Sequence, residues 1–195
     1  MATRKDRRVE RTQQLIRAAF RSLLEEKGYE ALTVQEIIDR ANIGRATFYA
    51  HFDSKDELFA SGFDELRTSL KMRQRTAMAQ GGDINDRVFA FSHELFVHVN
   101  EYRHVFHAMI GKQSGVVVQR LLHKLLIDLV REDVKLATEG GTPSAITIDA
   151  GAQFIAGGLF GLLVWWLNAK PRLSAEEVNG LFRKLAMPAL AGIVK

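Results

Sequence analysis

An all-α fold of about nine helices is the fold class that this 195-residue sequence predicts. Over long stretches apolar residues recur every three or four positions, which is the period of a helix with one buried face. Only 3 prolines interrupt these stretches, and no alternation of apolar and polar residues indicates a strand. Thr33, Ser54 and Ser174 are each followed three residues later by a glutamate, the capping box that opens a helix.

Two short helices separated by a tight corner are expected between residues 33 and 52. Thr33 and Glu36 cap the first, and the second runs from Arg45 to Phe52 after a break at Asn42-Ile43-Gly44. A helix-turn-helix needs this spacing to lay its second helix in the major groove of DNA. The segment therefore predicts a DNA-binding unit.

Longer helices flank this pair. One is expected over about residues 10–27, ended by Gly28, and another over about residues 55–79. No linker rich in Gly or Pro precedes Gly81-Gly82, so the second of these helices should join two domains. We expect a helix-turn-helix domain over residues 1–54 and a second helical domain over residues 55–195.

The charge of the chain is informative mainly at its start. The net charge is only +4, but the first eleven residues are mostly basic. They contain two acidic residues, Asp6 and Glu10, and five basic ones, Arg4, Lys5, Arg7, Arg8 and Arg11. Such an arm can rest on DNA phosphates, or it can be a solvated terminus. The same residues lack the apolar run of a secretory signal.

Residues 47–58 read TFYAHFDSKDEL, which resembles, without gaps, the motif of the DNA-binding domain of the TetR family of bacterial transcriptional regulators. The likeness covers about the first sixty residues, beginning in the helix that ends near Gly28-Tyr29. It implies a homodimeric repressor that binds a near-palindromic double-stranded operator and is released from it by a small apolar or aromatic ligand. The resemblance also implies a cytoplasmic protein that is nucleoid-associated when bound to DNA. An activator, or a structural or cell-cycle DNA-binding factor without a small-molecule inducer, remains an alternative.

The front of the second helix should carry the base contacts. Arg45 can donate two hydrogen bonds to a guanine, Ala46 allows close approach, and Thr47 offers a hydroxyl and a methyl group. Arg45 could instead clamp a phosphate only. The resemblance adds Gln35 as a possible base contact and implies backbone contacts for Thr33, Tyr49, His51 and Lys55.

The C-terminal half should form five further helices. We expect them over about residues 83–102, 103–110, 115–138, 143–168 and from 171 to the end. Residues 150–167 carry no charge, which reaches the length of a membrane span. Four glycines and Gln153 dilute this segment, so a helix buried in a dimer core is the favoured interpretation.

Two sites are expected in this half. The dimer interface should use small and bulky residues of the last two helices, namely Gly157, Gly158, Gly161, Leu162, Trp165, Leu181 and Leu185. A ligand cavity should be lined by the aromatic and soft residues Phe96, Tyr102, Phe106, Met109 and Phe160. Both sets could also be plain intramolecular core.

Enzymatic and metal sites are not expected. The sequence has no cysteine, and it contains none of the common nucleophile, phosphate-loop, dinucleotide or zinc-protease motifs. His104 and His107 share a helical face and could hold a metal ion, but no further ligand stands nearby. No cofactor is expected.

Overall fold

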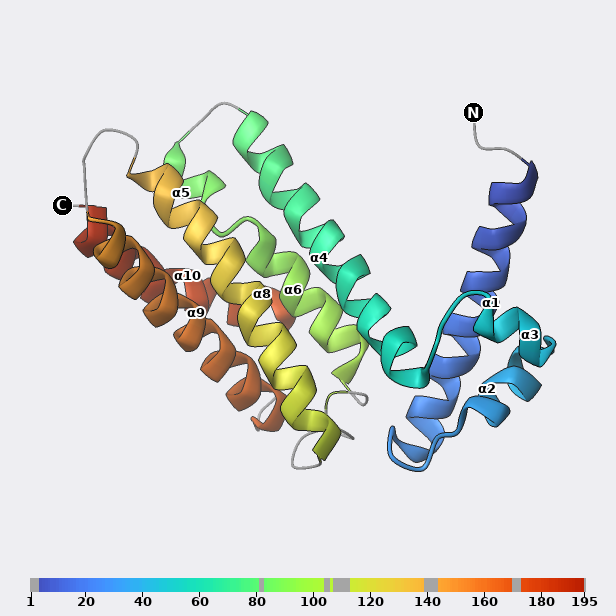
Figure 1. The fold of residues 1–195 in the computed structure, drawn as a ribbon. Helices are drawn as coiled ribbons and strands as arrows, with labels where there is room; N and C mark the ends of the chain where they lie inside the picture. The colour runs from blue at the N-terminus through green and yellow to red at the C-terminus, as the bar shows by residue number, and fades with distance from the viewer. Residues whose placement is uncertain are drawn as a thin grey trace.

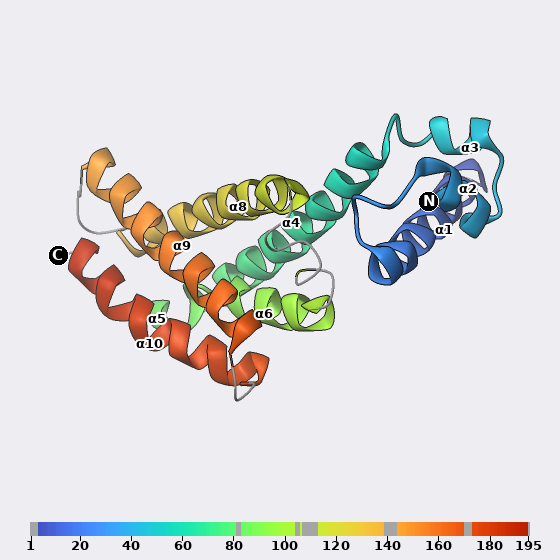
Figure 2. The same cartoon turned by 90° about the horizontal axis from the view of Figure 1, so that it is seen from below.

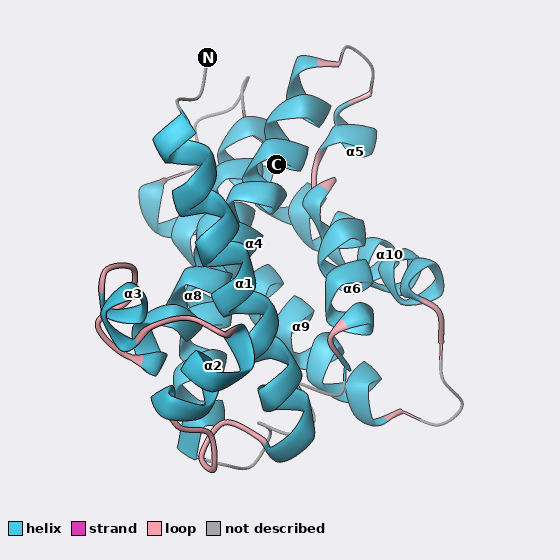
Figure 3. Ribbon diagram, turned by 90° about the vertical axis from the view of Figure 1, so that its right-hand side faces the viewer, coloured by secondary structure: helices cyan, strands magenta, loops and turns pink. Residues whose placement is uncertain are grey.

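The computed structural model describes residues 4–80, 83–103, 106, 113–138, 144–169 and 173–194, and all regular elements in these ranges are helices (Figure 3). The prediction of an all-α fold is confirmed. The elements are α1 (Arg4–Lys27), α2 (Val34–Ala41), α3 (Arg45–Tyr49), α4 (Lys55–Ala79), α5 (Ile84–Arg87), α6 (Phe91–Glu101), α8 (Gln113–Ala137), α9 (Ala145–Asn168) and α10 (Ala175–Val194).

Two separate hydrophobic cores lie at the two ends of the molecule (Figure 1). The first, which we call the head core, joins α1, α2 and α3 through residues such as Ile16, Ile37 and Phe48, each 0% exposed. The second, the C-terminal core, is built by α4, α6, α8, α9 and α10. Helix α4 belongs to both, because Leu58 lies in the head core and Leu70 in the C-terminal core.

Helix α1 begins earlier than the sequence indicated. It starts at Arg4, so the described part of the basic arm forms the first turns of this helix. Arg7, Arg8 and Arg11 are exposed on it, and the Thr12 hydroxyl donates to the carbonyl of Arg8 at 2.9 Å. The expected start near Glu10 is therefore wrong by about two turns.

The helix expected over residues 83–102 is interrupted. It divides into α5 and α6 at Phe89, whose φ of 58° is a left-handed conformation that a helix cannot contain. The N–H of Phe89 donates to the Asp133 carboxylate at 2.7 Å, and Arg183 donates to the carbonyl of Val88 at 2.8 Å. Side chains from α8 and α10 thus replace the lost helical bonds.

Helix α9 lies between α8 and α10 (Figure 2). Among the described residues it is the one helix long and apolar enough to cross a membrane by length and composition, with a mean hydropathy of 1.6. In the 18-residue stretch of α9 that has this hydropathy, 44% of the residues are buried in the protein. Trp166 and Leu159 belong to this buried set and are part of the C-terminal core.

Several expected features fall on residues outside the described ranges. They include most of the short helix expected over residues 103–110, with His104, His107 and Met109, and the loop residues Gly81, Gly82 and Pro143.

Candidate nucleic-acid interface

The corner between α2 and α3 is fixed by backbone geometry and caps. Thr33 caps α2 with its side chain, and Glu36 completes the capping box, as the sequence predicted. The helix ends at Asn42 in a left-handed conformation with φ of 50°, and Gly44 then opens α3. The chain turns here within three residues, which is the geometry of a helix-turn-helix.

Helix α3 ends at Tyr49 and not at Phe52 as expected, and buried aromatic side chains within and just after it hold it in place. Phe48 is 0% exposed and Phe52 is 5% exposed, and their ring centroids lie 6.1 Å apart in the head core. With these two side chains buried, Arg45 and Ala46 at the front of the helix are exposed to solvent. The end of α3 that would meet base edges is therefore open.

An aromatic and a basic side chain lie together on the exposed side of α3. Tyr49 is 43% exposed, its ring meets Phe48 edge-on at 5.4 Å, and the Arg45 guanidinium lies 5.6 Å from its centroid. This cation–π contact restricts the Arg45 side chain without using its hydrogen-bond donors. Thr47 and His51 are half-buried beside them.

Other expected DNA contacts are engaged within the protein. The Thr33 hydroxyl donates to Glu36 at 2.7 Å, and the Gln35 amide donates to Asp39 at 2.9 Å. The Lys55 ammonium donates to the carbonyls of Tyr29 and Leu32 at 3.0 and 2.9 Å, which leaves one of its three hydrogens for a phosphate. These three contacts remain predictions, each in competition with an internal bond.

Two ion pairs that the sequence did not reveal fasten α2 to α1. Arg40 binds both carboxylate oxygens of Glu26 at 2.6 and 2.8 Å, and Lys27 pairs with Glu36. The hydrogen bond from Arg40 lowers the pKa of Glu26 to about 2, and that from Lys27 lowers the pKa of Glu36 to about 2. Both carboxylates therefore stay charged at neutral pH, and the two ion pairs hold the angle between these helices.

The ligand residues expected from the sequence do not form one site. Phe96 is 0% exposed and packs edge-on against Trp166 at 5.6 Å, so it is a core side chain and is not among the residues that line the cavity described below. Phe160 packs against the same core, with its ring 5.5 Å from that of His123. Tyr102 and Phe106 line the cavity described next, and Met109 lies outside the described residues.

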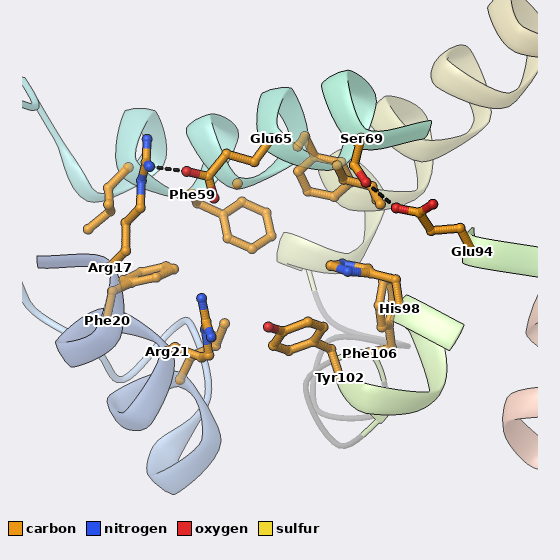
Figure 4. Close-up of a pocket in the computed structure, with 15 residues that line it drawn as sticks. Arg17, Phe20, Arg21, Phe59, Glu65, Ser69, Glu94, His98, Tyr102 and Phe106 are labelled. Carbon is orange, nitrogen blue, oxygen red and sulfur yellow. Dashed lines mark hydrogen bonds and ion pairs between the residues drawn. The ribbon is translucent and has the colours of Figure 1, made fainter. Parts of the chain in front are cut away.

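That cavity has a volume of about 310 Å³ and lies between α1, α4 and α6, where the head meets the C-terminal domain (Figure 4). Its walls include Arg17, Phe20, Arg21 and Leu24, none of which was expected at a ligand site. Their spacing of three and four residues marks one face of α1. Arg17 and Arg21 lie on the same helical face as the apolar residues Phe20 and Leu24, and this pattern could have indicated a polar site there.

The residues expected at a dimer interface lie on the outer side of α9 and α10. Trp165, Leu181 and Leu185 are 50%, 39% and 69% exposed, and Leu162 is half-buried against the core. An added Cβ at Gly157, Gly158 or Gly161 would meet nothing within 4 Å. In the single chain this face is apolar and open.

Two family models match the chain. The model of bacterial regulatory proteins of the tetR family matches residues 15–61, and a model of a transcriptional regulator C-terminal region matches residues 86–187, more than half of the sequence. The chain belongs to the TetR family. This TetR family protein is a DNA-binding transcriptional regulator, and it is not an enzyme.

Individual relatives agree with this family. YhgD of Bacillus subtilis, an uncharacterized regulator of the helix-turn-helix type, is 21% identical over 94% of this chain and 98% of its own length. YxbF of the same organism is 46% identical over 84% of the chain, which spans 42% of YxbF. FadR of Thermus thermophilus, a repressor solved with lauroyl-CoA, superposes with a TM-score of 0.66 at 19% identity, over 91% and 94% of the chains, and so shares the fold.

Proposed function

We propose that this regulator is a homodimeric repressor that binds a near-palindromic operator and leaves it when a small organic ligand binds. The observation that carries the proposal is the exposed front of α3, where Arg45 and Ala46 face solvent while Phe48 anchors the helix. A helix presented in this way enters the major groove with its first residues against the base edges.

The individual contacts follow from side-chain chemistry. Arg45 and Thr47 read bases, with Arg45 bidentate on a guanine, and Ala46 leaves room for the approach. Tyr49 and His51 contact the backbone on the two sides of the groove. Lys55 adds its one uncommitted N–H, whereas Thr33 and Gln35 contribute only when a phosphate or base replaces their internal partners.

Dimerisation through α9 and α10 supplies the second head. One short helix makes few contacts, so a specific site needs two heads, spaced roughly 34–36 Å or a little more apart along one face of the duplex. The exposed tryptophan and leucines and the open glycine surface of these helices favour a close helix–helix contact. Each subunit would contribute the same face.

Release by a ligand is supported by a relative and by the cavity. FadR of Thermus thermophilus is a repressor and was solved with lauroyl-CoA. In the present chain the cavity of about 310 Å³ touches both the head and α4, so that an occupant can favour one orientation of the head over another. The regulator acts in the cytoplasm, on the nucleoid.

The decisive experiment selects bound sequences from random duplexes with the purified protein. A near-palindrome should emerge, and Arg45→Ala should lose its preference at one or two positions of each half-site, at a cost of about 1–3 kcal/mol. Arg73→Ala changes an exposed arginine on α4, away from the head, and is the matched control.

The control should select the same sequence as the wild type. Equal losses of affinity for all sequences in Arg45→Ala would reduce Arg45 to a phosphate contact. Failure of the wild type to enrich any duplex at low ionic strength would overturn the proposed function as a whole.

A further inference from the structure

The cavity between the head and the C-terminal domain has aromatic walls from three elements. Phe20 comes from α1 and Phe59 and Phe63 come from α4. Tyr102 is the C-cap of α6, and Phe106 lies four residues later. The ring centroids of Phe59 and Phe63 lie 5.5 Å apart, and those of Phe20 and Phe59 lie 6.1 Å apart. A flat apolar group would find ring faces and edges on several sides.

Both carboxylates in the cavity wall are already bound. Glu65 pairs with Arg17 across α4 and α1, and Glu94 accepts a hydrogen bond from Ser69 across α6 and α4 (Figure 4). A cationic ligand would therefore have to displace an existing donor. Among the described residues Arg17 Nε is in addition buried without a hydrogen-bond partner, so this wall has a donor to spare.

The opposite wall carries a positive charge over a ring. The Arg21 guanidinium lies 5.1 Å from the centroid of Tyr102, whose other neighbour is the His98 ring at 4.6 Å. Burial lowers the pKa of His98, so its imidazole is neutral at pH 7 and the charge at this end belongs to Arg21. The Arg21 guanidinium lies over the face of the Tyr102 ring. This contact uses none of the guanidinium N–H donors, which stay available for a carboxylate.

From this arrangement we infer that the interdomain cavity binds a small aromatic carboxylic acid, with Arg21 on the carboxylate and Phe59, Phe63 and Phe106 around the ring. A guanidinium matches a carboxylate with two parallel hydrogen bonds, which a neutral or cationic ligand cannot accept in that form. A volume of about 310 Å³ is at the lower end of ligand pockets, and so favours a one-ring acid over a long acyl chain.

The position of the site connects the acid to DNA binding, and this part rests on the proposed function. Arg21 and Phe20 belong to α1 of the head, whereas Tyr102 and Phe106 follow α6 on the other side of the cavity. Phe63 and Phe106 pack against both cores. A ligand held between these walls stabilises one setting of the head relative to α6, and thereby one spacing of the two heads in a dimer.

Calorimetric titrations with three ligands of one shape test the inference: benzoate, the neutral benzamide and the cationic benzylamine. Benzoate should bind the wild type at least about tenfold more tightly than either of the others. Arg21→Gln should remove this preference while leaving benzamide binding unchanged. Arg7→Gln, an exposed arginine on the same helix outside the cavity, should behave as the wild type.

A second pair of variants tests the place of binding. Gly62 lines the cavity, and an added Cβ there meets nothing within 4 Å, so Gly62→Leu can place its side chain in the space without a backbone clash. This variant should lose benzoate binding, and Gly62→Ala should retain it. A benzoate affinity that survives in Gly62→Leu, that equals the benzamide affinity, or that ignores Arg21→Gln would overturn the inference, as would no binding of benzoate at all.

Gel shifts with the selected operator separate this inference from the function on which it rests. Benzoate should change operator affinity in the wild type and not in Arg21→Gln. If benzoate binds but operator affinity stays constant, the coupling is overturned and the site stands. If no duplex is bound without benzoate, the proposed function fails, whatever the titrations give.

Discussion

Asp133 is a carboxyl group enclosed in the C-terminal core, and its surroundings explain why an acid is placed there. It accepts hydrogen bonds at 2.7 Å from the side-chain amide of Gln74 and from the backbone N–H of Phe89. Burial nevertheless raises the pKa of Asp133 to about 7. The residue ties α8 to the left-handed backbone between α5 and α6, and its charge makes this tie sensitive to pH.

Stability should therefore fall with rising pH through this one group. The unfolded carboxyl has a pKa of 3.8, so the native state holds the proton more tightly and the free energy of unfolding should decline between about pH 4 and 7, by up to roughly 4 kcal/mol. In Asp133→Asn this decline should be absent. Urea unfolding at several pH values measures it, with Asp86→Asn, an exposed carboxylate, as the control. An unchanged decline in Asp133→Asn would show that another group is responsible.

At the scale of single residues, burial and exposure could be predicted best where a short sequence pattern determines them. The i, i+4 pair Phe48 and Phe52 is buried as expected, which leaves Arg45 exposed. The environment of Lys55 was not predictable, because its partners are backbone carbonyls more than twenty residues earlier. The placement of Phe96 against Trp166 was not predictable for the same reason, since only tertiary packing distinguishes a core aromatic side chain from one that lines a cavity.

At the scale of elements, the cap of α2 sets the start of the helix-turn-helix. The Thr33 hydroxyl accepts from the N–H of Glu36, and both the hydroxyl and the N–H of Thr33 donate to the Glu36 carboxylate. These are all short-range contacts, which is why the capping box could be predicted from four residues of sequence.

Removing this cap should destabilise the head. Thr33→Ala should lower the free energy of unfolding by about 1 kcal/mol, since the first turn of α2 loses its side-chain acceptor, and Thr33→Ser should restore most of it. Thr76→Ala, at an exposed position within α4, should change stability by much less. Urea unfolding compares the three variants. Equal effects of the alanine changes at positions 33 and 76 would argue against the capping role.

Interrupted helices were the weakest part of the element-level prediction. Apolar periodicity runs through residues 83–102 without a glycine or proline to stop it, so one helix was expected there. The interruption at Phe89 depends on donors and acceptors supplied by Asp133 and Arg183 from distant helices. No window of local sequence contains that information.

At the scale of the whole molecule, the outer face of α9 and α10 should pair two chains. Leu185→Glu, at a side chain that is 69% exposed, should convert a dimer to a monomer because it places a charge in an apolar contact. Met72→Glu, at an equally open position on α4 that is 65% exposed, should remain dimeric. Light scattering after size-exclusion chromatography measures both. A monomeric wild type, or a dimer that survives Leu185→Glu, would contradict this interface.

The two-domain arrangement could be anticipated from sequence, whereas the cavity between the domains could not. The start of α4 at Lys55 was expected from Ser54 and Glu57, and the Ser54 hydroxyl accepts from the N–H of Glu57 there. The domain boundary near residue 54 stays a prediction. The cavity exists because α1 and α6 do not close upon each other. Aromatic side chains that pack against both cores, Phe63 and Phe106, lie between them.

Helix α4, 25 residues and about 37 Å long, reaches from one core into the other as an unbroken rod. A tilt of only five degrees at its far end would carry the near end by about 3 Å, close to the rise of one base pair. A small rotation of α4 at its C-terminal end is therefore enough to change the position of the head on DNA. It also means that the DNA-binding half and the ligand-binding half can change separately, as long as this helix and the Phe59 and Phe63 rings in its first turns are kept.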